Sequence, residues 1–348
     1  MSGKPTGRSA QRSQDRLRHS TGIVIPVYLP NDVDRDPVIA LLHDTVAGCC
    51  LQIADPASIC LSVDGAENGA AVAQQLAEAY GVTIAISPVN RGKLQGVREG
   101  ARQLIDQRDP AYIGVIDCDS DHFPNEMLNF VRAAEHIVDQ TGDDRLLMLG
   151  RRISRHRPMG LLRGELEDLA DRMLAHALAY HAAVVGVPLR LEYATLLEQV
   201  PDYHSGYKLF SRRSAAAVFL SDPQLAGLSD TAYYRHAVEA VMVVEAVLSG
   251  ARLGVINRST YNRQPVTAFG RLDRADLTAD MIIWPCKRLG VPPHFVRQWL
   301  HNELPALLLS TLIPEGRDEL EAVYREVLAA FGGVDDIVDP FATSSLFI

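Results

Sequence analysis

The sequence lacks the long apolar run that a membrane-spanning helix requires. No stretch approaches the roughly 18 consecutive apolar residues of such a span, and residues 1–20 contain no apolar segment of a secretory signal. Hydrophobic residues make up 47% of the chain and charged residues 22%, while aromatics are few, at 6%. That balance is typical of a soluble globular protein, so we expect a cytoplasmic protein without stable membrane insertion.

Cysteines with the spacing of a metal site are also missing. The five cysteines are Cys49, Cys50, Cys60, Cys118 and Cys286, and no two of them form a C-x-x-C pair. An odd count without that spacing argues against a disulfide framework and against a zinc site. We expect mostly buried, reduced thiols, which agrees with a cytoplasmic protein.

Positive charge is scarce outside the N-terminus. The chain of 348 residues holds 34 Lys and Arg against 43 Asp and Glu, for a net charge of −9. Residues 1–20 carry about +4 of this balance, and their polar composition predicts a disordered tail. The acidic remainder lacks the basic surface of a nucleic-acid binder, and anionic membrane surfaces would repel it.

Motifs of several common enzyme classes are absent. The turn after the first predicted strand, VYLPND, contains no glycine, whereas a dinucleotide fold would place G-x-G-x-x-G there. The sequence also has no P-loop, no H-E-x-x-H and no G-x-S-x-G. These absences disfavour hydride transfer, P-loop phosphoryl transfer, zinc hydrolysis and the usual serine hydrolases.

The first 150 residues instead alternate between strand and helix. Strands are predicted at 22–28, 58–64, 82–86, 112–117 and 146–149, and helices at 38–50, 67–80, 96–107 and 124–138. This alternation predicts an α/β fold with a mainly parallel central sheet flanked by helices. Helical spacing returns at 162–184 and 234–248, a strand follows at 253–257, and a mostly helical elaboration ends the chain.

The strongest chemical signal is the segment VIDCDSD after the fourth predicted strand. Ligands of open α/β sheets bind beyond the carboxyl ends of the strands, and Asp117, Asp119 and Asp121 would share one face of an extended segment. Three such carboxylates need a cation, and oxygen ligands favour Mg²⁺ or Mn²⁺. An acidic turn that only caps the next helix is the alternative.

Two more features fall at the same edge of the sheet. Asp64 closes the second predicted strand, and the basic loop Asn90-Arg91-Gly92-Lys93 lies between the third strand and its helix. Backbone N–H groups at a helix N-terminus and nearby positive charge suit a phosphate. Together, the three features predict a nucleotide-diphosphate site with a metal.

This set of motifs resembles the family 2 glycosyltransferases and their relatives of GT-A fold, over about residues 21–265. The first strand ends like the family's V-I-P-x-Y, and an N-x-G-K loop and a D-x-D motif follow in the family's order. The resemblance implies that nucleotide-sugar binding involves Pro26, Tyr28, Asp64, Arg91, Lys93 and Asp117. It assigns the metal to Asp117 and Asp119, and Asp121 takes the place of a third oxygen ligand.

Within this family the chain is most similar to dolichyl-phosphate mannose synthase-like enzymes and to soluble glucosyl- and mannosyl-glycerate synthases. HSGYK at 204–208 matches T-S-G-F-R, and Arg263 matches an Arg-bearing loop only loosely. The acceptor and phosphate contacts implied are His204, Ser205, Gly206, Lys208 and Arg263. Because His204 replaces the family's Thr and no membrane helix is visible, we expect a small soluble acceptor.

Glu239 is the expected general base. It lies on the apolar segment AVEAVMVVEAVLSG, and its distance from Gly250 matches the family's acidic position. A base there would take the proton of the acceptor hydroxyl. Glu245 is a competitor, Asp202 and His204 are next in line, and a surface-facing Glu239 is the structural alternative. A retaining reaction would need no such base.

These predictions combine into one hypothesis. Residues 21–270 form a GT-A domain, with a nucleotide-binding half at 21–150 and an acceptor half at 151–270, before a helical extension at 271–348. The chain would be a metal-dependent glycosyltransferase that uses a nucleotide-diphosphate sugar. A sugar-phosphate nucleotidyltransferase and a non-catalytic nucleotide-sugar-binding protein of this fold are the alternatives. The sugar, the base, the acceptor, the anomeric outcome and a homodimer stay open.

Overall fold

The computed structural model describes residues 7–30, 32, 34–154, 156–196, 199–260 and 272–333. The chain divides into two compact units that interleave along the sequence. The first unit comprises residues 1–153, 190–223 and 242–266, and the second comprises 154–189, 224–241 and 267–348. This division differs from the expected boundaries at 150 and 270, because the chain leaves the first unit and later returns to it.

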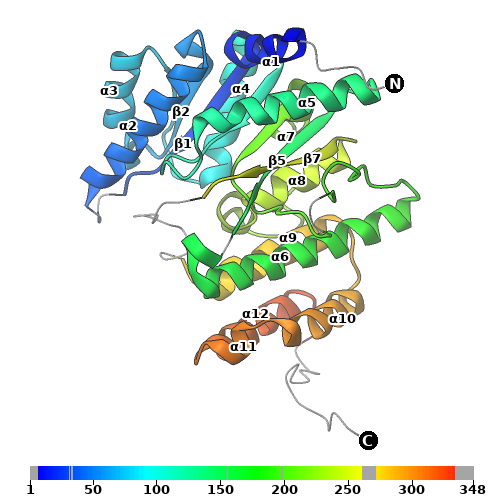
Figure 1. The fold of residues 1–348 in the computed structure, drawn as a ribbon. Coiled ribbons are helices and arrows are strands. Elements are labelled where there is room, and N and C mark those ends of the chain that lie inside the picture. The colour runs from blue at the N-terminus through cyan, green and yellow to red at the C-terminus, as the bar shows by residue number, and fades with distance from the viewer. Residues whose placement is uncertain are drawn as a thin grey trace, which may run out of the picture. The chain divides into compact units, whose positions relative to one another are not determined.

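The first unit is built on a sheet with the strand order β3-β2-β1-β4-β6-β5-β7. Figure 1 labels β1, β2, β5 and β7 of this sheet. The strands are β1 Thr21–Val27, β2 Ile59–Asp64, β3 Thr83–Ser87, β4 Tyr112–Val115, β5 Leu146–Arg152, β6 Lys208–Ser211 and β7 Arg252–Arg258. Strand β6 is antiparallel to β4 and β5, and the other pairs are parallel. The expected α/β fold with a mainly parallel sheet is confirmed.

Strand β6 has no counterpart among the predicted strands. Its sequence KLFS contains no β-branched residue, and it is held as a strand by hydrogen bonds to neighbours on both sides. Its position matters for the site, because β6 carries Lys208 at its start and places the 202–206 loop beside the end of β4.

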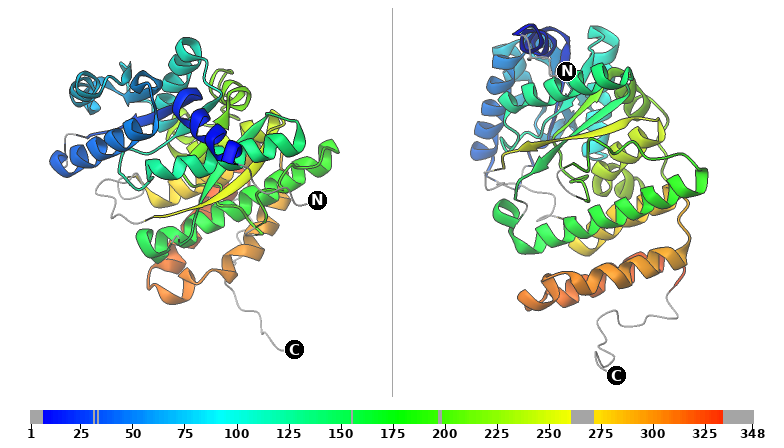
Figure 2. Two further views of the ribbon diagram at one scale, coloured as in Figure 1. Left: turned by 45° about the horizontal axis from the view of Figure 1, so that its top comes forward. Right: turned by 45° about the vertical axis from the view of Figure 1, so that its right-hand side comes forward.

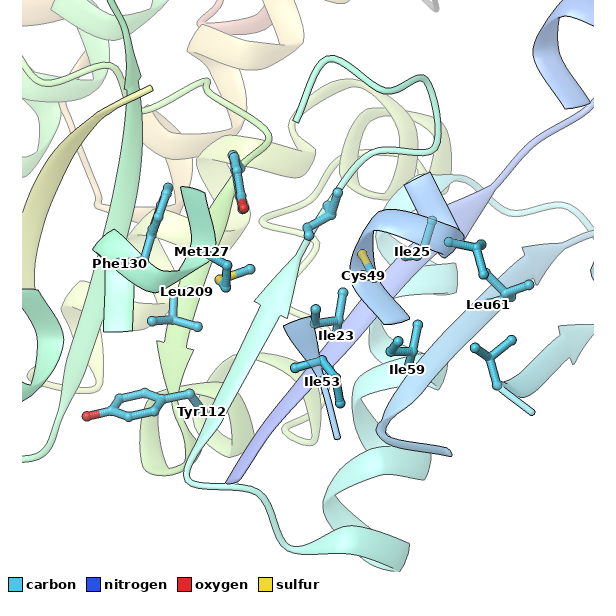
Figure 3. Packing of buried hydrophobic residues seen from close by; sticks show 14 of the residues in the cluster. Ile23, Ile25, Cys49, Ile53, Ile59, Leu61, Tyr112, Met127, Phe130 and Leu209 are labelled. Carbon is cyan, nitrogen blue, oxygen red and sulfur yellow. The ribbon is translucent and has the colours of Figure 1, made fainter. Parts of the chain in front are cut away.

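Helices cover both faces of this sheet. The helices of the first unit are α1 Gly7–Ser20, α2 Arg35–Gln52, α3 Ala70–Tyr80, α4 Lys93–Arg108, α5 Met127–Thr141 and α7 Arg212–Phe219. On one face α2 and α5 bury an apolar core, and Figure 3 shows Cys49 and Ile53 near Ile23 and Ile59 of the sheet. On the other face α4 packs closely, since a Cβ on Gly100 would lie 2.7 Å from Val24 Cγ1.

The prediction of a disordered tail over residues 1–20 is wrong for residues 7–20, which form helix α1. Arg12 donates hydrogen bonds to Asp139 on α5 at 2.9 and 3.0 Å and also pairs with Glu135. Leu17 is buried in the core on the same side of the sheet. The polar composition was misleading because the arginines of α1 pair with carboxylates more than a hundred residues away.

The second unit is helical. It contains α6 His156–Val185, kinked at Gly160, a π-helical turn Ala232–His236, and then α9 Arg274–Arg288, α10 Pro293–Glu303, α11 Leu309–Leu312 and α12 Gly316–Ala330. Figure 2 shows α6 and α9 side by side. Helix α8, Val238–Leu248, spans the division between the units. The expected helical C-terminal part is confirmed, and no helix in the described residues is long and apolar enough to cross a membrane.

Candidate active site

The acidic motif lies on a turn rather than on an extended segment. Strand β4 ends at Val115, residues 118–119 form a turn, and Ser120 has a positive φ of 60°. The Ser120 hydroxyl donates to Leu41 O of α2 at 3.0 Å and lies 3.1 Å from Thr45 Oγ1. The prediction that three aspartates share one strand face is therefore wrong, because this turn interrupts the alternation on which it relied.

Each of the three aspartates has a different partner. Asp117 Oδ1 lies 2.7 Å from Lys93 Nζ, and Asp121 Oδ2 lies 3.1 Å from Arg258 Nη1. Asp119 Oδ1 accepts a hydrogen bond from the backbone N–H of Asp121 at 3.2 Å. Among the described residues, no group of three or more His, Cys, Asp or Glu is arranged to hold a metal ion. Metal binding by all three carboxylates stays a prediction, and the structure pairs Asp121 with a buried arginine.

The charges around the turn act on Asp117 and Asp119 in opposite directions. Burial works to raise the pKa of Asp117, but Lys93, Arg258 and Lys208 outweigh it and hold that pKa below its usual range. Burial and the nearby charge of Asp117 raise the pKa of Asp119 to about 6. The mutual repulsion of these two carboxylates favours a positive charge beside them.

Asp64 organises the basic loop. One carboxylate oxygen accepts the backbone N–H of Arg91 at 3.0 Å, and the other accepts that of Gly92. These two bonds fix the chain just before α4 begins at Lys93. The Arg91 side chain is exposed and lines a cavity of about 550 Å³ between β3 and α4. The structure thus brings Asp64, the 90–93 loop and the acidic turn together at one sheet edge, as the sequence predicts.

The 202–208 segment packs against the acidic turn at the same edge of the sheet, next to the end of β4. A Cβ on Gly206 would lie only 2.6 Å from Asp117 Oδ2, so the carboxylate lies directly against the backbone there. Lys208 is fully buried, and its ammonium donates to Ser205 O. Ser205 is also fully buried, whereas His204 is 6% exposed. Ser205 and Lys208 therefore make internal contacts, in place of the open acceptor loop that the sequence suggested.

Asp202 forms a buried ion pair with Arg152 at the end of β5. Its Oδ2 accepts from the Arg152 backbone N–H at 2.9 Å and from Nε at 2.8 Å. Both side chains are at most 5% exposed. A carboxylate held this way is a poor proton acceptor, because removing its charge would leave the guanidinium buried and unpaired. This contact argues against Asp202 as a reserve base.

Two further residues of this edge, Arg258 and His122, are not among the predicted site residues. Arg258, at the end of β7, donates to Asp121, to Ser205 Oγ at 3.2 Å and to Gly150 O at 3.3 Å. His122 accepts the backbone N–H of Asp117 through Nδ1 at 2.9 Å and stacks on Tyr207. A charged residue at the carboxyl end of a predicted strand was the available signal for Arg258. For His122 the available signal was its place directly after the acidic motif.

The remaining predicted residues are placed as follows. Pro26 is half-buried within β1, and Tyr28, 38% exposed, follows the strand. Glu239 lies in the first turn of α8 and is half-buried, within the second unit. His236, three residues earlier, places Nδ1 2.6 Å from Asp280 Oδ2. Arg263 lies outside the described residues.

Comparisons with known proteins identify no family. No family model matches the chain, and no curated protein matches it. Among solved structures, the crystal structure of S. aureus TarS 1–349 aligns over 92% of this chain and 95% of that chain. The identity is 12% and the TM-score 0.42. Likeness at that level assigns neither a family nor an activity.

Proposed function

We propose that this chain is a glycosyltransferase of GT-A type that moves a sugar from a nucleotide-diphosphate donor to a soluble hydroxyl acceptor. The observation that carries the proposal is the contact between Lys93 and Asp117, which joins the basic loop to the acidic turn. Asp64, Gly206 and Arg258 complete the same cluster. A carboxylate turn beside a phosphate-type loop is chemically suited to a diphosphate.

The topology of the sheet supports this location for the donor. Strand β1 pairs with β2 on one side and with β4 on the other, so the order of the strands reverses at β1. In open α/β sheets, ligands bind outside the carboxyl ends of the strands at such a reversal. Tyr28 follows β1, and the acidic turn follows β4. The base would then lie toward Tyr28 and Asp64, and the diphosphate toward Lys93.

A divalent metal, Mg²⁺ or Mn²⁺, fits two of the three aspartates. Such an ion is commonly held by one or two carboxylates together with substrate phosphates, and the raised pKa of Asp119 beside Asp117 favours a cation there. Asp117 and Asp119 would hold it, while Asp121 remains with Arg258. When bound, the metal would stabilise the negative charge of the departing diphosphate.

The chain's own residues have complementary tasks in this proposal. Lys93, the first residue of α4, and the backbone N–H groups of that helix end would bind phosphate oxygens. Lys208 would stabilise the acidic turn through its charge near Asp117, and Arg258 through its ion pair with Asp121. If the reaction inverts configuration, Glu239 would take the acceptor proton, and if it retains configuration, Glu239 would position the sugar.

A thermal-shift panel of nucleotide sugars, each with Mn²⁺ or with EDTA, tests the proposal. A donor at 100 to 1,000 times its dissociation constant should add about 3–4 kcal/mol to the free energy of unfolding. We expect one nucleotide class to stabilise the protein, and more strongly with Mn²⁺. The Asp119→Ala variant should lose the additional stabilisation that Mn²⁺ gives, and it should lose turnover. No stabilisation by any nucleotide sugar would contradict the proposal.

Product analysis separates the two alternatives. Incubation with the stabilising donor should release nucleoside diphosphate once an acceptor is supplied. A sugar-phosphate nucleotidyltransferase would instead form a nucleotide sugar from a nucleoside triphosphate and a sugar phosphate. A non-catalytic binding protein would be stabilised by the donor and release nothing.

A further inference from the structure

The cations around the acidic turn differ in whether they can leave it. Lys208 is fully buried and bonded to Ser205 O, and Arg258 is 2% exposed and bonded to three backbone or side-chain oxygens besides Asp121. Lys93, by contrast, has a side chain 30% exposed on a flexible stem. Its partner Asp117 is 25% exposed at the side chain. Lys93 is therefore the member of this set that can exchange its partner.

The position of Lys93 also conflicts with a metal on Asp117. An ammonium 2.7 Å from Asp117 Oδ1 occupies the coordination space of that oxygen and neutralises its charge. The formal charges of Asp117, Asp119 and Asp121 are balanced by Lys93, Lys208 and Arg258. A divalent ion entering this arrangement would gain little electrostatic energy unless Lys93 moved away.

A diphosphate gives Lys93 an alternative partner. The residue begins α4, where the N-cap Gly92 offers no side-chain hydrogen bond to the helix end, and phosphate oxygens are favoured at such an end. We propose that Lys93 competes with the divalent cation for Asp117, and that a nucleoside diphosphate relieves this competition by drawing the ammonium onto its phosphates. Metal and nucleotide then strengthen each other's binding by the same factor.

This inference rests on the proposed function for its nucleotide half, whereas its metal half can be tested alone. Calorimetric titration of Mn²⁺ into the protein without nucleotide compares wild type with Lys93→Met and Lys93→Gln. We expect both variants to bind Mn²⁺ about tenfold more tightly than wild type, because Asp117 is released. Lys93→Arg, which keeps the charge, should resemble wild type. Lys287→Met removes a lysine of the second unit and serves as the matched control for net charge.

A second titration measures the coupling. With UDP or GDP present, Mn²⁺ affinity should rise at least fivefold in wild type, and clearly less in Lys93→Met. Adding Asp119→Asn to Lys93→Met should abolish Mn²⁺ binding, which assigns the ion to the acidic turn. Equal Mn²⁺ affinities of wild type and Lys93→Met, or no measurable binding by either, would overturn the inference. If neither nucleotide nor any other nucleoside diphosphate binds, the proposed function fails. The Mn²⁺ affinities of wild type and Lys93→Met without nucleotide would still show whether Lys93 competes with the ion for Asp117.

Discussion

At the scale of single residues, the sheet edge stands out for its buried charge. Lys208 and Asp202 are fully buried, and Arg258 and Arg152 are nearly so. Burying a charge is costly unless it is paired and hydrogen-bonded. Arg152 and Asp202 pair with each other, Arg258 pairs with Asp121, and Lys208 donates to the Ser205 carbonyl; the two arginines also hold the loops that carry predicted site residues. Charges that only keep a protein soluble lie on its surface, whereas buried clusters of charged groups are common at functional sites.

Gly206 is predicted to tolerate no side chain. A Cβ would come within 2.6 Å of Asp117 Oδ2 and 3.1 Å of His122 Cε1, so Gly206→Ala must displace the carboxylate or the loop. We expect donor or Mn²⁺ affinity to fall about tenfold or more, measured by calorimetry. Gly206→Ala combined with Asp117→Asn should be little worse than Asp117→Asn alone, because neighbouring substitutions that act on one contact are not additive. Fully additive losses would argue against this contact.

Asp119 should make the stability of the protein depend on pH. Its pKa is raised from 3.8 to about 6, so the folded state favours the protonated acid. As the pH rises from about 4 to about 6, the unfolded chain ionises first, and wild type should lose stability relative to Asp119→Asn. Above pH 6 the difference should level off. Melting temperatures of both proteins between pH 4 and 8 measure this.

The same comparison has an internal control. Mn²⁺ added at pH 7 together with UDP or GDP should stabilise wild type more than Asp119→Asn, because Asp119 would help to hold the ion. A wild-type melting temperature that stays parallel to that of Asp119→Asn over the whole range would show that Asp119 titrates normally.

At the scale of elements, α1 changes from an expected tail into part of the core. Leu17 is 3% exposed, and Leu17→Ala should lower the free energy of unfolding by about 2–4 kcal/mol through a cavity beneath the helix. Arg12→Ala should cost about 1 kcal/mol or less, because Arg12 and Asp139 are exposed and Arg16 still pairs with the buried Glu135. Urea unfolding measures both. If Leu17→Ala were neutral, α1 would not be docked in solution.

Helix α8 provides a test of its two half-buried glutamates. Glu239 lies in its first turn and Glu245 near its end, on a helix otherwise rich in buried Val, Met and Ala. If Glu239 takes the acceptor proton, Glu239→Gln should lower kcat and kcat/KM together by about 10²-fold or more. Donor affinity should change little, and Glu245→Gln should be mild. A large loss in Glu245→Gln alone would move the base to that residue, while two mild variants would agree with a retaining reaction.

At the scale of the whole molecule, the nucleotide-binding half predicted at 21–150 is not independent. Strand β4 is bonded on one side to β6, which comes from residues 208–211, and β5 is bonded to β6 and β7. A fragment of residues 1–153 would lack both β6 and β7 and would expose the edge of β4. We expect this fragment to aggregate, or to lack the cooperative thermal unfolding that circular dichroism should detect in the full chain.

The sequence by itself determined the alternating strands and helices and the convergence of three motifs. Gly81, for example, follows the predicted helix at 67–80 and ends α3 in the left-handed conformation typical of glycine at a helix end. Periodicity and end signals act within a few residues, so they can be seen without the rest of the chain. The convergence follows from topology, because parallel strands bring their carboxyl ends, and hence Asp64 and Asp117, to one edge.

Only the tertiary structure decided which partner each charge meets. Asp121 pairs with Arg258 across 137 positions of sequence, and Asp202 with Arg152 across 50. Tertiary contacts also decide the structure of α1, where Arg12 bonds to Asp139 of α5. They decide that of β6, which is a strand because β4 and β5 pair with it. No local pattern encodes such pairings. A buried charge is stable only where the fold supplies its counter-charge, and that choice is made when distant segments pack together.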